Sequence, residues 1–199
     1  MKKMMKLAAL LALTAVLLTG CVDMTGLGQT DEPQATMPPM TVPMFEDRLT
    51  AYQYYNEVTL EDTMETLTGR YGEPKKETTD NGDSYTWVME DGYGFAATFF
   101  DSGRLRAKVL YYEDIRQLGA ISEATGIDKF SQLSKDYTYE MTCGLLGGKP
   151  MELAQIVQDT SADPEVKRLF VWATSKGDVV QVLFTGAEKV ESVSYSLAE

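Results

Sequence analysis

An internal repeat constrains this chain more than any other feature. The segment "LTGRYGEP", residues 67–74, matches "CGLLGGKP", residues 143–150, in its Gly-x-x-Gly spacing. Each segment is followed by an alternating run centred on a tryptophan, Trp87 in the first and Trp172 in the second, and then by a glycine turn and further alternating runs. The same order of elements occurring twice predicts two copies of one supersecondary unit.

Helical periodicity indicates a pair of helices at the start of each unit. In the first unit, apolar residues at helical spacing predict a helix at 45–57. Thr59 and Asp62 have the spacing of a capping box, which predicts a second helix through Leu67. Either glycine of the first Gly-x-x-Gly frame supplies the end of this helix. The second unit repeats the pair at 127–135 and 138–146.

Alternating residues predict four strands after each helix pair. In the first unit they fall at 75–79, 84–89, 95–100 and 105–112. The Asn81-Gly82 pair between the first two indicates a tight hairpin, because its central positions need positive φ. In the second unit the first hairpin is enlarged by residues 159–165.

The predicted fold class is therefore α+β, with two tandem α-α-β-β-β-β modules. Each module is expected to be a helix pair packed on its own four-stranded antiparallel sheet. The first module spans 45–112, the second spans 127–199, and an inter-module linker at 113–126 joins them.

The N-terminus has the features of a secretory signal. Three lysines are followed by an apolar run at 7–18 and by the tetrapeptide Leu-Thr-Gly-Cys that ends at Cys21. The run is short and is followed by small residues, which favours a cleaved signal peptide at 1–20 over a spanning helix. The tetrapeptide resembles a bacterial lipobox, which implies a diacylglycerol on Cys21. We therefore expect an extracytoplasmic protein anchored to a membrane by lipid, since two or more acyl chains anchor stably.

Residues 21–44 are predicted to be the lipidated cysteine and a disordered tether, because they hold four of the seven prolines and no sustained periodicity. Removing the three signal lysines from the 18 basic residues leaves 15 against 30 acidic residues, a net charge near −15. Such a charge argues against nucleic acid as a partner. It is consistent with solubility in the envelope or with attraction to a basic partner.

The chemistry of the chain argues against most enzyme classes. The chain has no histidine, which removes the usual general base of serine and cysteine hydrolases and the commonest zinc ligand. With Cys21 lipidated, Cys143 has no disulfide partner and is interpreted as a small buried hydrophobe or a reactive thiol. We expect no catalytic residues, no metal and no cofactor. A hydrolase that uses carboxylates alone remains an alternative.

Part of the second unit resembles a known family. Residues 130–140, with Phe130, Leu133 and the run Asp136–Glu140, lead into Leu145–Gly148 and then into the tryptophan-bearing strands. This pattern resembles the module of the β-lactamase inhibitory protein family, and it is similar to small outer-membrane lipoproteins that support β-barrel assembly. The resemblance implies helix pairs on one face of each sheet. It also implies a shallow concave surface, made by the opposite faces, for another protein.

The resemblance also draws attention to the turn "EDGYGF", residues 90–95. In the inhibitory family, a turn of the first module presents an aspartate and tyrosines to the target enzyme, just before an Ala-Thr-Phe strand. Here Asp91, Tyr93 and Phe95 precede Ala97-Thr98-Phe99, while the equivalent turn of the second unit, 175–180, has no aromatic residue. Tyr93 and Phe95 are thus either partner contacts or residues that pack locally.

The strand pattern adds a sheet face to these candidates. If Trp87 and its alternate neighbours face the helices, an apolar second face is left as an interface between repeats or as a docking surface. The candidate partner-binding residues are Glu90, Asp91, Tyr93 and Phe95 in the turn, and Phe100, Arg106, Lys108 and Tyr112 on that face.

The expected function is a lipid-anchored extracytoplasmic protein-binding module, which inhibits or modulates an envelope enzyme through the 90–95 turn and the concave sheet face. The alternative is a structural or scaffold lipoprotein of envelope assembly, which uses other faces of the sheet or helices. In both cases the partner is an extracytoplasmic protein, and the membrane is reached through the lipid on Cys21.

Overall fold

The computed structural model describes residues 52, 54–79, 82–88, 94–111, 123–148, 150–158 and 164–197. All of them belong to one compact unit, Val42–Glu199, which is distinct from residues 1–41. The predicted signal peptide, Cys21 and the tether at 21–44 lie outside the described residues. Within the described part of the chain, no helix has the length and apolar character needed to cross a membrane.

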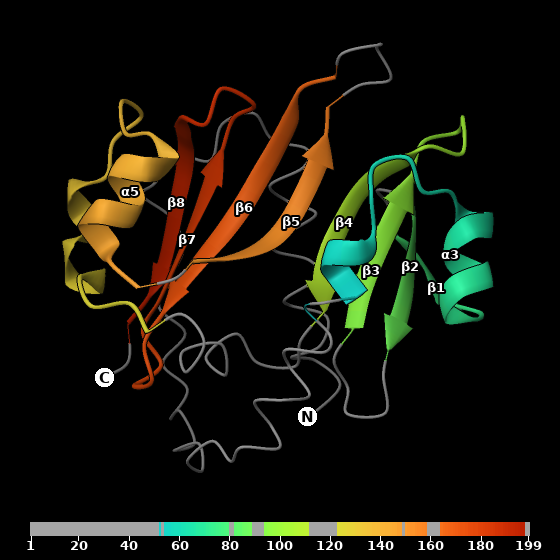
Figure 1. Cartoon of the computed structure of the whole chain (residues 1–199), viewed down its shortest axis with the longest axis horizontal. Helices are drawn as coiled ribbons and strands as arrows, with labels where there is room; N and C mark the ends of the chain where they lie inside the picture. The colour runs from blue at the N-terminus through green and yellow to red at the C-terminus, as the bar shows by residue number, and fades with distance from the viewer. Residues whose placement is uncertain are drawn as a thin grey trace. The chain divides into compact units, whose positions relative to one another are not determined.

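The fold is α+β, with short helices and one eight-stranded antiparallel sheet whose strands lie in sequence order (Figure 1). The strands are β1 Lys75–Thr79, β2 Gly82–Val88, β3 Gly94–Phe99, β4 Leu105–Tyr111, β5 Met151–Val157, β6 Val166–Ala173, β7 Val179–Phe184 and β8 Val190–Ser196. This arrangement is consistent with two halves of four strands each. We call β1–β4 with helix α3 the first half, and β5–β8 with helices η2 and α5 the second half.

The expectation of two separate four-stranded sheets was wrong, because β4 pairs directly with β5. The pairs are Ala107 with Ile156, Lys108 with Gln155, and Val109 with Ala154, and we call this pairing the seam. Unpaired, β4 and β5 would each present an open edge of backbone donors and acceptors. Six of the seven β5 residues are buried, as expected for a central strand. The sequence shows the two halves but not which of their edges meet.

The helices begin and end at polar caps and glycines. Helix α3, Met64–Tyr71, starts at a capping box between Thr63 and Thr66 and ends at Gly72, whose φ is 81°. The predicted start at Thr59 was too early. Asp62 accepts a hydrogen bond from the Thr59 N–H at 2.7 Å, and this bond closes a tight turn before the helix.

The second half repeats the capped helix that ends at a glycine. Helix α5, Tyr139–Leu146, is capped by Thr138 and ends at Gly147, whose φ is 67°. The segment predicted as a helix at 127–135 is instead a 3₁₀ helix, η2, Ile127–Gln132. Such short 3₁₀ segments commonly serve as connectors.

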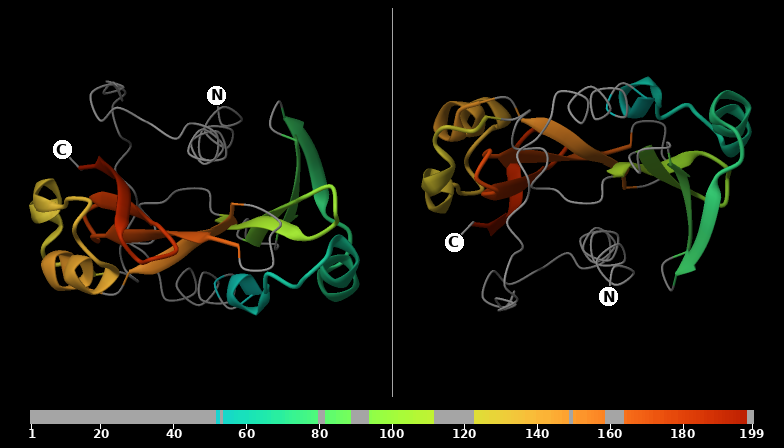
Figure 2. Two further views of the ribbon diagram at one scale, coloured as in Figure 1. Left: turned by 90° about the horizontal axis from the view of Figure 1, so that it is seen from above. Right: turned by 90° about the horizontal axis from the view of Figure 1, so that it is seen from below.

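Helices α3, η2 and α5 lie on one face of the sheet (Figure 2). In the first half the ring of Tyr71, on α3, lies 5.1 Å from that of Phe95. In the second half the ring of Tyr139, on α5, lies 4.7 Å from Phe170 and 5.6 Å from Phe184. These aromatic contacts fix each helix to its own half.

The strand register corrects the predicted sheet faces. Trp87 pairs with Phe95, and Phe95 pairs with Leu110, so these three side chains share the helix-covered face. Lys108, two residues from Leu110, lies on that face as well and not on the opposite face as predicted. The opposite face carries a row of paired residues, Ala96, Val109, Ala154, Leu169 and Leu183; Val109 is half-buried and the other four are at most 6 % exposed. The centre of that face is therefore not an open docking surface.

A buried polar network crosses the seam on the helix-covered face. The Tyr55 hydroxyl donates to Glu152 Oε1 at 2.8 Å, and Arg168 Nε donates to Glu152 Oε2 at 2.6 Å. Lys108 Nζ donates to the backbone oxygens of Val58 at 2.7 Å and Tyr55 at 3.1 Å. The network therefore ties β4, β5 and β6 to the segment 54–58, in which residues 54–57 are helical.

Burial sets the protonation behaviour of this network. Tyr55, Lys108 and Glu152 are 0 %, 4 % and 5 % exposed. Burial lowers the pKa of Lys108, although the nearby Glu152 carboxylate opposes this shift. Burial and the Glu152 carboxylate both raise the pKa of Tyr55 well above its usual value, so Tyr55 stays a neutral donor.

We predict that Lys108→Met destabilises the protein by about 1–3 kcal/mol, because two buried carbonyl groups lose their charged donor. The measurement is the free energy of unfolding in urea. The control is Lys75→Met, since the Lys75 side chain is 71 % exposed on the edge strand, where ion pairs contribute about 0–1 kcal/mol. Equal stabilities of the two variants would contradict the role given to the network.

Candidate functional site

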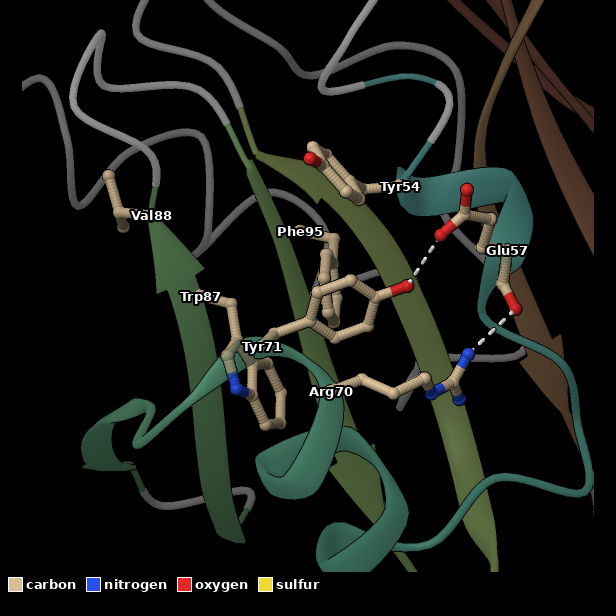
Figure 3. Close-up of a pocket in the computed structure, with 7 residues that line it drawn as sticks. All are labelled: Tyr54, Glu57, Arg70, Tyr71, Trp87, Val88 and Phe95. Atoms are coloured by element: carbon tan, nitrogen blue, oxygen red, sulfur yellow. Dashed lines mark hydrogen bonds between the residues drawn. The ribbon is translucent and has the colours of Figure 1, made fainter.

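A hollow of about 500 Å³ opens on the first half, beside α3. It is lined by Tyr54, Glu57, Arg70, Tyr71, Trp87, Val88 and Phe95. Figure 3 shows six of these side chains converging from three places: Tyr54 and Glu57 from the helical turn 54–57, Arg70 and Tyr71 from the end of α3, and Trp87 and Phe95 from β2 and β3; Val88 stands apart from them at the end of β2. We call this site the hollow.

Tyr71 is the central side chain of the hollow. Its hydroxyl donates to Glu57 Oε2 at 3.0 Å, as the dashed line in Figure 3 marks. Its ring meets the Tyr54 ring edge-on, with centroids 5.6 Å apart and planes at 84°. Burial, and then the hydrogen bond to Glu57, raise the pKa of Tyr71 to about 12. Tyr71 is therefore a neutral donor at physiological pH.

Arg70 forms the polar side of the hollow and is already engaged. It donates to Asp62 in a short contact and to the Glu57 backbone oxygen at 3.3 Å. Burial alone would raise the pKa of Asp62. The hydrogen bonds from the Thr59 N–H, from Arg70 and from Thr66 outweigh burial and lower that pKa. The Arg70 charge is thus balanced by an ionised Asp62.

The floor of the hollow is closed and its rim is open. Trp87 and Phe95 stack with centroids 5.0 Å apart and are 5 % and 1 % exposed. The Trp87 indole N–H donates to the Gly72 backbone oxygen at 2.8 Å, which fixes the ring against the end of α3. Val88, the next residue on β2, is 49 % exposed at the rim. Val88 therefore adds one exposed apolar residue at the edge of the hollow.

Gly94 explains how closely β2 and β3 approach at the hollow. A Cβ atom at this position would collide with the Trp87 carbonyl group. Only glycine fits where two backbones come this close. The "GYGF" pattern therefore has a structural reason at its second glycine. Residues 89–93 join Val88 to Gly94, so both ends of the predicted binding turn lie at the hollow.

The structure separates the predicted partner-binding residues into three groups. Lys108 is 4 % exposed and lies in the interior, while Phe95 is 1 % exposed and forms part of the closed floor of the hollow. Phe100 and Arg106 are half-buried, with the guanidinium group 5.9 Å from the ring centre. Glu90, Asp91, Tyr93 and Tyr112 lie outside the described residues, so their proposed contacts stay predictions.

Six of the seven residues that line the hollow were not among the predicted site residues: Tyr54, Glu57, Arg70, Tyr71, Trp87 and Val88. Tyr71 stands inside the "LTGRYGEP" segment, next to the glycine that ends α3, and was passed over as part of a helix end. An aromatic residue directly before a helix-ending glycine is the signal that would have indicated it.

No metal or thiol chemistry is supported by the described residues. Within the described ranges, no three side chains of the metal-binding types come together. Cys143 is half-buried against the core of the second half, and burial raises the pKa of its thiol. A raised pKa favours the unreactive protonated form.

No protein-family model and no curated protein matches this chain. Among solved structures, the chain is similar to a DUF4309 family protein, YjgB, from Bacillus subtilis, with 12 % sequence identity and a TM-score of 0.30. The match covers 76 % of this chain and 93 % of that one. The comparisons identify no β-lactamase inhibitory protein family, so that resemblance stays a prediction.

We predict that Asp62→Asn lowers the free energy of unfolding by about 1–3 kcal/mol at pH 7, because Arg70 loses its charged acceptor. The folded-state pKa of Asp62 is lowered, so its stabilisation is present above the unfolded value, about 3.9, and is lost as the pH falls through the folded pKa. The difference between wild type and variant should therefore shrink below pH 4. A difference that is constant with pH would contradict this assignment.

Proposed function

We propose that this chain is a lipid-anchored, extracytoplasmic protein-binding module that holds its partner at the hollow and the adjoining 89–93 turn. The observation that carries the proposal is the exposed Val88 at the rim of an aromatic hollow, at the base of that turn. The lipid anchor rests on the lipobox-like sequence before Cys21. No catalytic role is proposed.

The shape and chemistry of the hollow support contact with a protein. Tyr54 and Tyr71 are half-buried, so each keeps part of its ring at the surface. Rings held in place by neighbouring contacts bury area at a small cost in conformational entropy. Buried aromatic anchors typically contribute about 2 kcal/mol or more each at the centre of an interface. The resemblance to the inhibitory protein family adds the idea that the partner is an envelope enzyme.

The alternative function is a scaffold lipoprotein of envelope assembly that binds through its helices. Met141 on α5 favours this alternative, because it is 50 % exposed, as open as Val88. Val88 lies on β2 of the first half and Met141 on α5 of the second half. They therefore give a matched pair for deciding between the two binding surfaces.

We predict that a photo-crosslinking amino acid at position 88 of the full-length protein, expressed in bacteria, captures a discrete partner. The same amino acid at position 141 should capture none, although the two sites are equally exposed. Val88→Asp should weaken the binding of the captured partner at least tenfold, and Met141→Asp should not. Crosslinks from position 141 alone would replace the proposal with the scaffold alternative.

The turn itself is tested separately. Asp91→Ala with Tyr93→Ala should weaken the same partner if the turn contributes contacts. An unchanged affinity with an unchanged unfolding midpoint would remove the turn from the interface and leave the hollow alone.

A further inference from the structure

We propose that the hollow receives a cationic side chain, lysine or arginine, of the protein partner. This inference rests on the proposed function and specifies the chemistry of the same site. It joins three observations: the charge left over at the hollow, the arrangement of its aromatic walls, and the way the hollow already holds its own cation.

The net charge at the hollow is negative once the ion pair between Arg70 and Asp62 is counted. Arg70 is the only cation among the seven lining residues, and Asp62 already balances it. Glu57 is exposed, and its carboxylate accepts a hydrogen bond from the neutral Tyr71 hydroxyl. A cationic group entering here would therefore meet the Glu57 carboxylate, whose hydrogen-bond donor within the hollow is an uncharged hydroxyl.

The walls suit a cation as well. Tyr54 and Tyr71 stand at 84° to one another, next to the Glu57 carboxylate group. Ring faces attract ammonium and guanidinium groups by about 0.5–2 kcal/mol. The Arg70 guanidinium group already lies 5.3 Å from the centre of the Tyr71 ring. The hollow thus uses a ring-to-cation contact within its own structure.

Other side-chain classes fit less well. An anionic group would meet Glu57 and would have to compete with Asp62 for Arg70. An apolar group would cover the Glu57 carboxylate without offering a donor, and an uncompensated buried carboxylate is costly. A basic group satisfies the carboxylate and packs its apolar stem against the rings of Tyr54 and Tyr71.

The net charge of the whole chain also favours a basic partner. The sequence carries a formal charge of −12 at pH 7. A strongly acidic surface speeds the approach of a basic partner, and salt weakens this attraction.

The test uses the chain from residue 22 onward, so that only the predicted signal and lipid site are missing. The probes are blocked tripeptides Gly-X-Gly in which X is lysine, arginine, norleucine or glutamate. Binding is followed by the NMR shift of the Trp87 indole N–H at the floor of the hollow. Lysine and arginine peptides should give saturable shifts. Norleucine, which has an uncharged chain of similar length, should bind at least fivefold more weakly, and glutamate should not bind.

Glu57→Gln should weaken the lysine peptide at least fivefold. The control Glu77→Gln changes a half-buried edge-strand carboxylate that is not among the lining residues, and should leave binding unchanged. Equal binding of norleucine and lysine, or no shift with any peptide, would overturn the inference.

The partner captured from position 88 separates this inference from the proposed function. If its affinity is insensitive to Glu57→Gln and to salt, the cationic contact is wrong while binding at the hollow stands. If position 88 captures nothing, the proposed function itself fails.

Discussion

The contact between Glu152 and Tyr55 holds the central part of this fold together. The Glu152 carboxylate lies on β5 and accepts the Tyr55 hydroxyl at 2.8 Å, while Arg168 from β6 supplies the balancing charge. Lys108 adds a second link, from β4 to the backbone of the same segment. The seam has only three paired positions, and this network spans it.

The network also positions the hollow, because two residues that line the hollow belong to the same helical turn as Tyr55. Tyr54 and Glu57, which form one wall of the hollow, flank the anchored Tyr55 in the helical turn 54–57. The opposite wall comes from α3, β2 and β3, which the aromatic stack of Trp87, Phe95 and Tyr71 holds in place. A buried charged network of this kind contributes little net stability compared with an apolar core, but each of its members is costly to remove. Its role here is to place one segment accurately on the sheet.

The sequence predicted the local structure well because its signals are local. The β1 strand was predicted with the observed bounds, and Gly72, which ends α3, is one of the two glycines that the sequence offered for that role. The helix predicted at 138–146 is α5, with Thr138 as its cap. The seam was missed because strand alternation indicates which residues share a face but not which strand edges pair. Lys108 was misplaced for a related reason: its buried position depends on carbonyl groups about fifty residues earlier in the chain. The hollow was missed because its residues come from four separate segments: the turn 54–57, α3, β2 and β3. In addition, the repeat pattern drew attention to the glycines around Tyr71 and not to Tyr71 itself.

The central claim is that the seam makes the two halves one cooperative unit, and the two tryptophans test it directly. Trp87 reports on the first half and Trp172 on the second, so the single-tryptophan variants Trp172→Phe and Trp87→Phe each follow one half during urea unfolding. Two-state unfolding requires that different probes give coincident transitions. In each variant, the midpoint of the fluorescence transition is compared with the midpoint of the far-ultraviolet circular dichroism transition. If the two halves unfold together, the two midpoints coincide in both variants. Two separated transitions, one for each tryptophan, would show that the halves unfold independently and would contradict the claim.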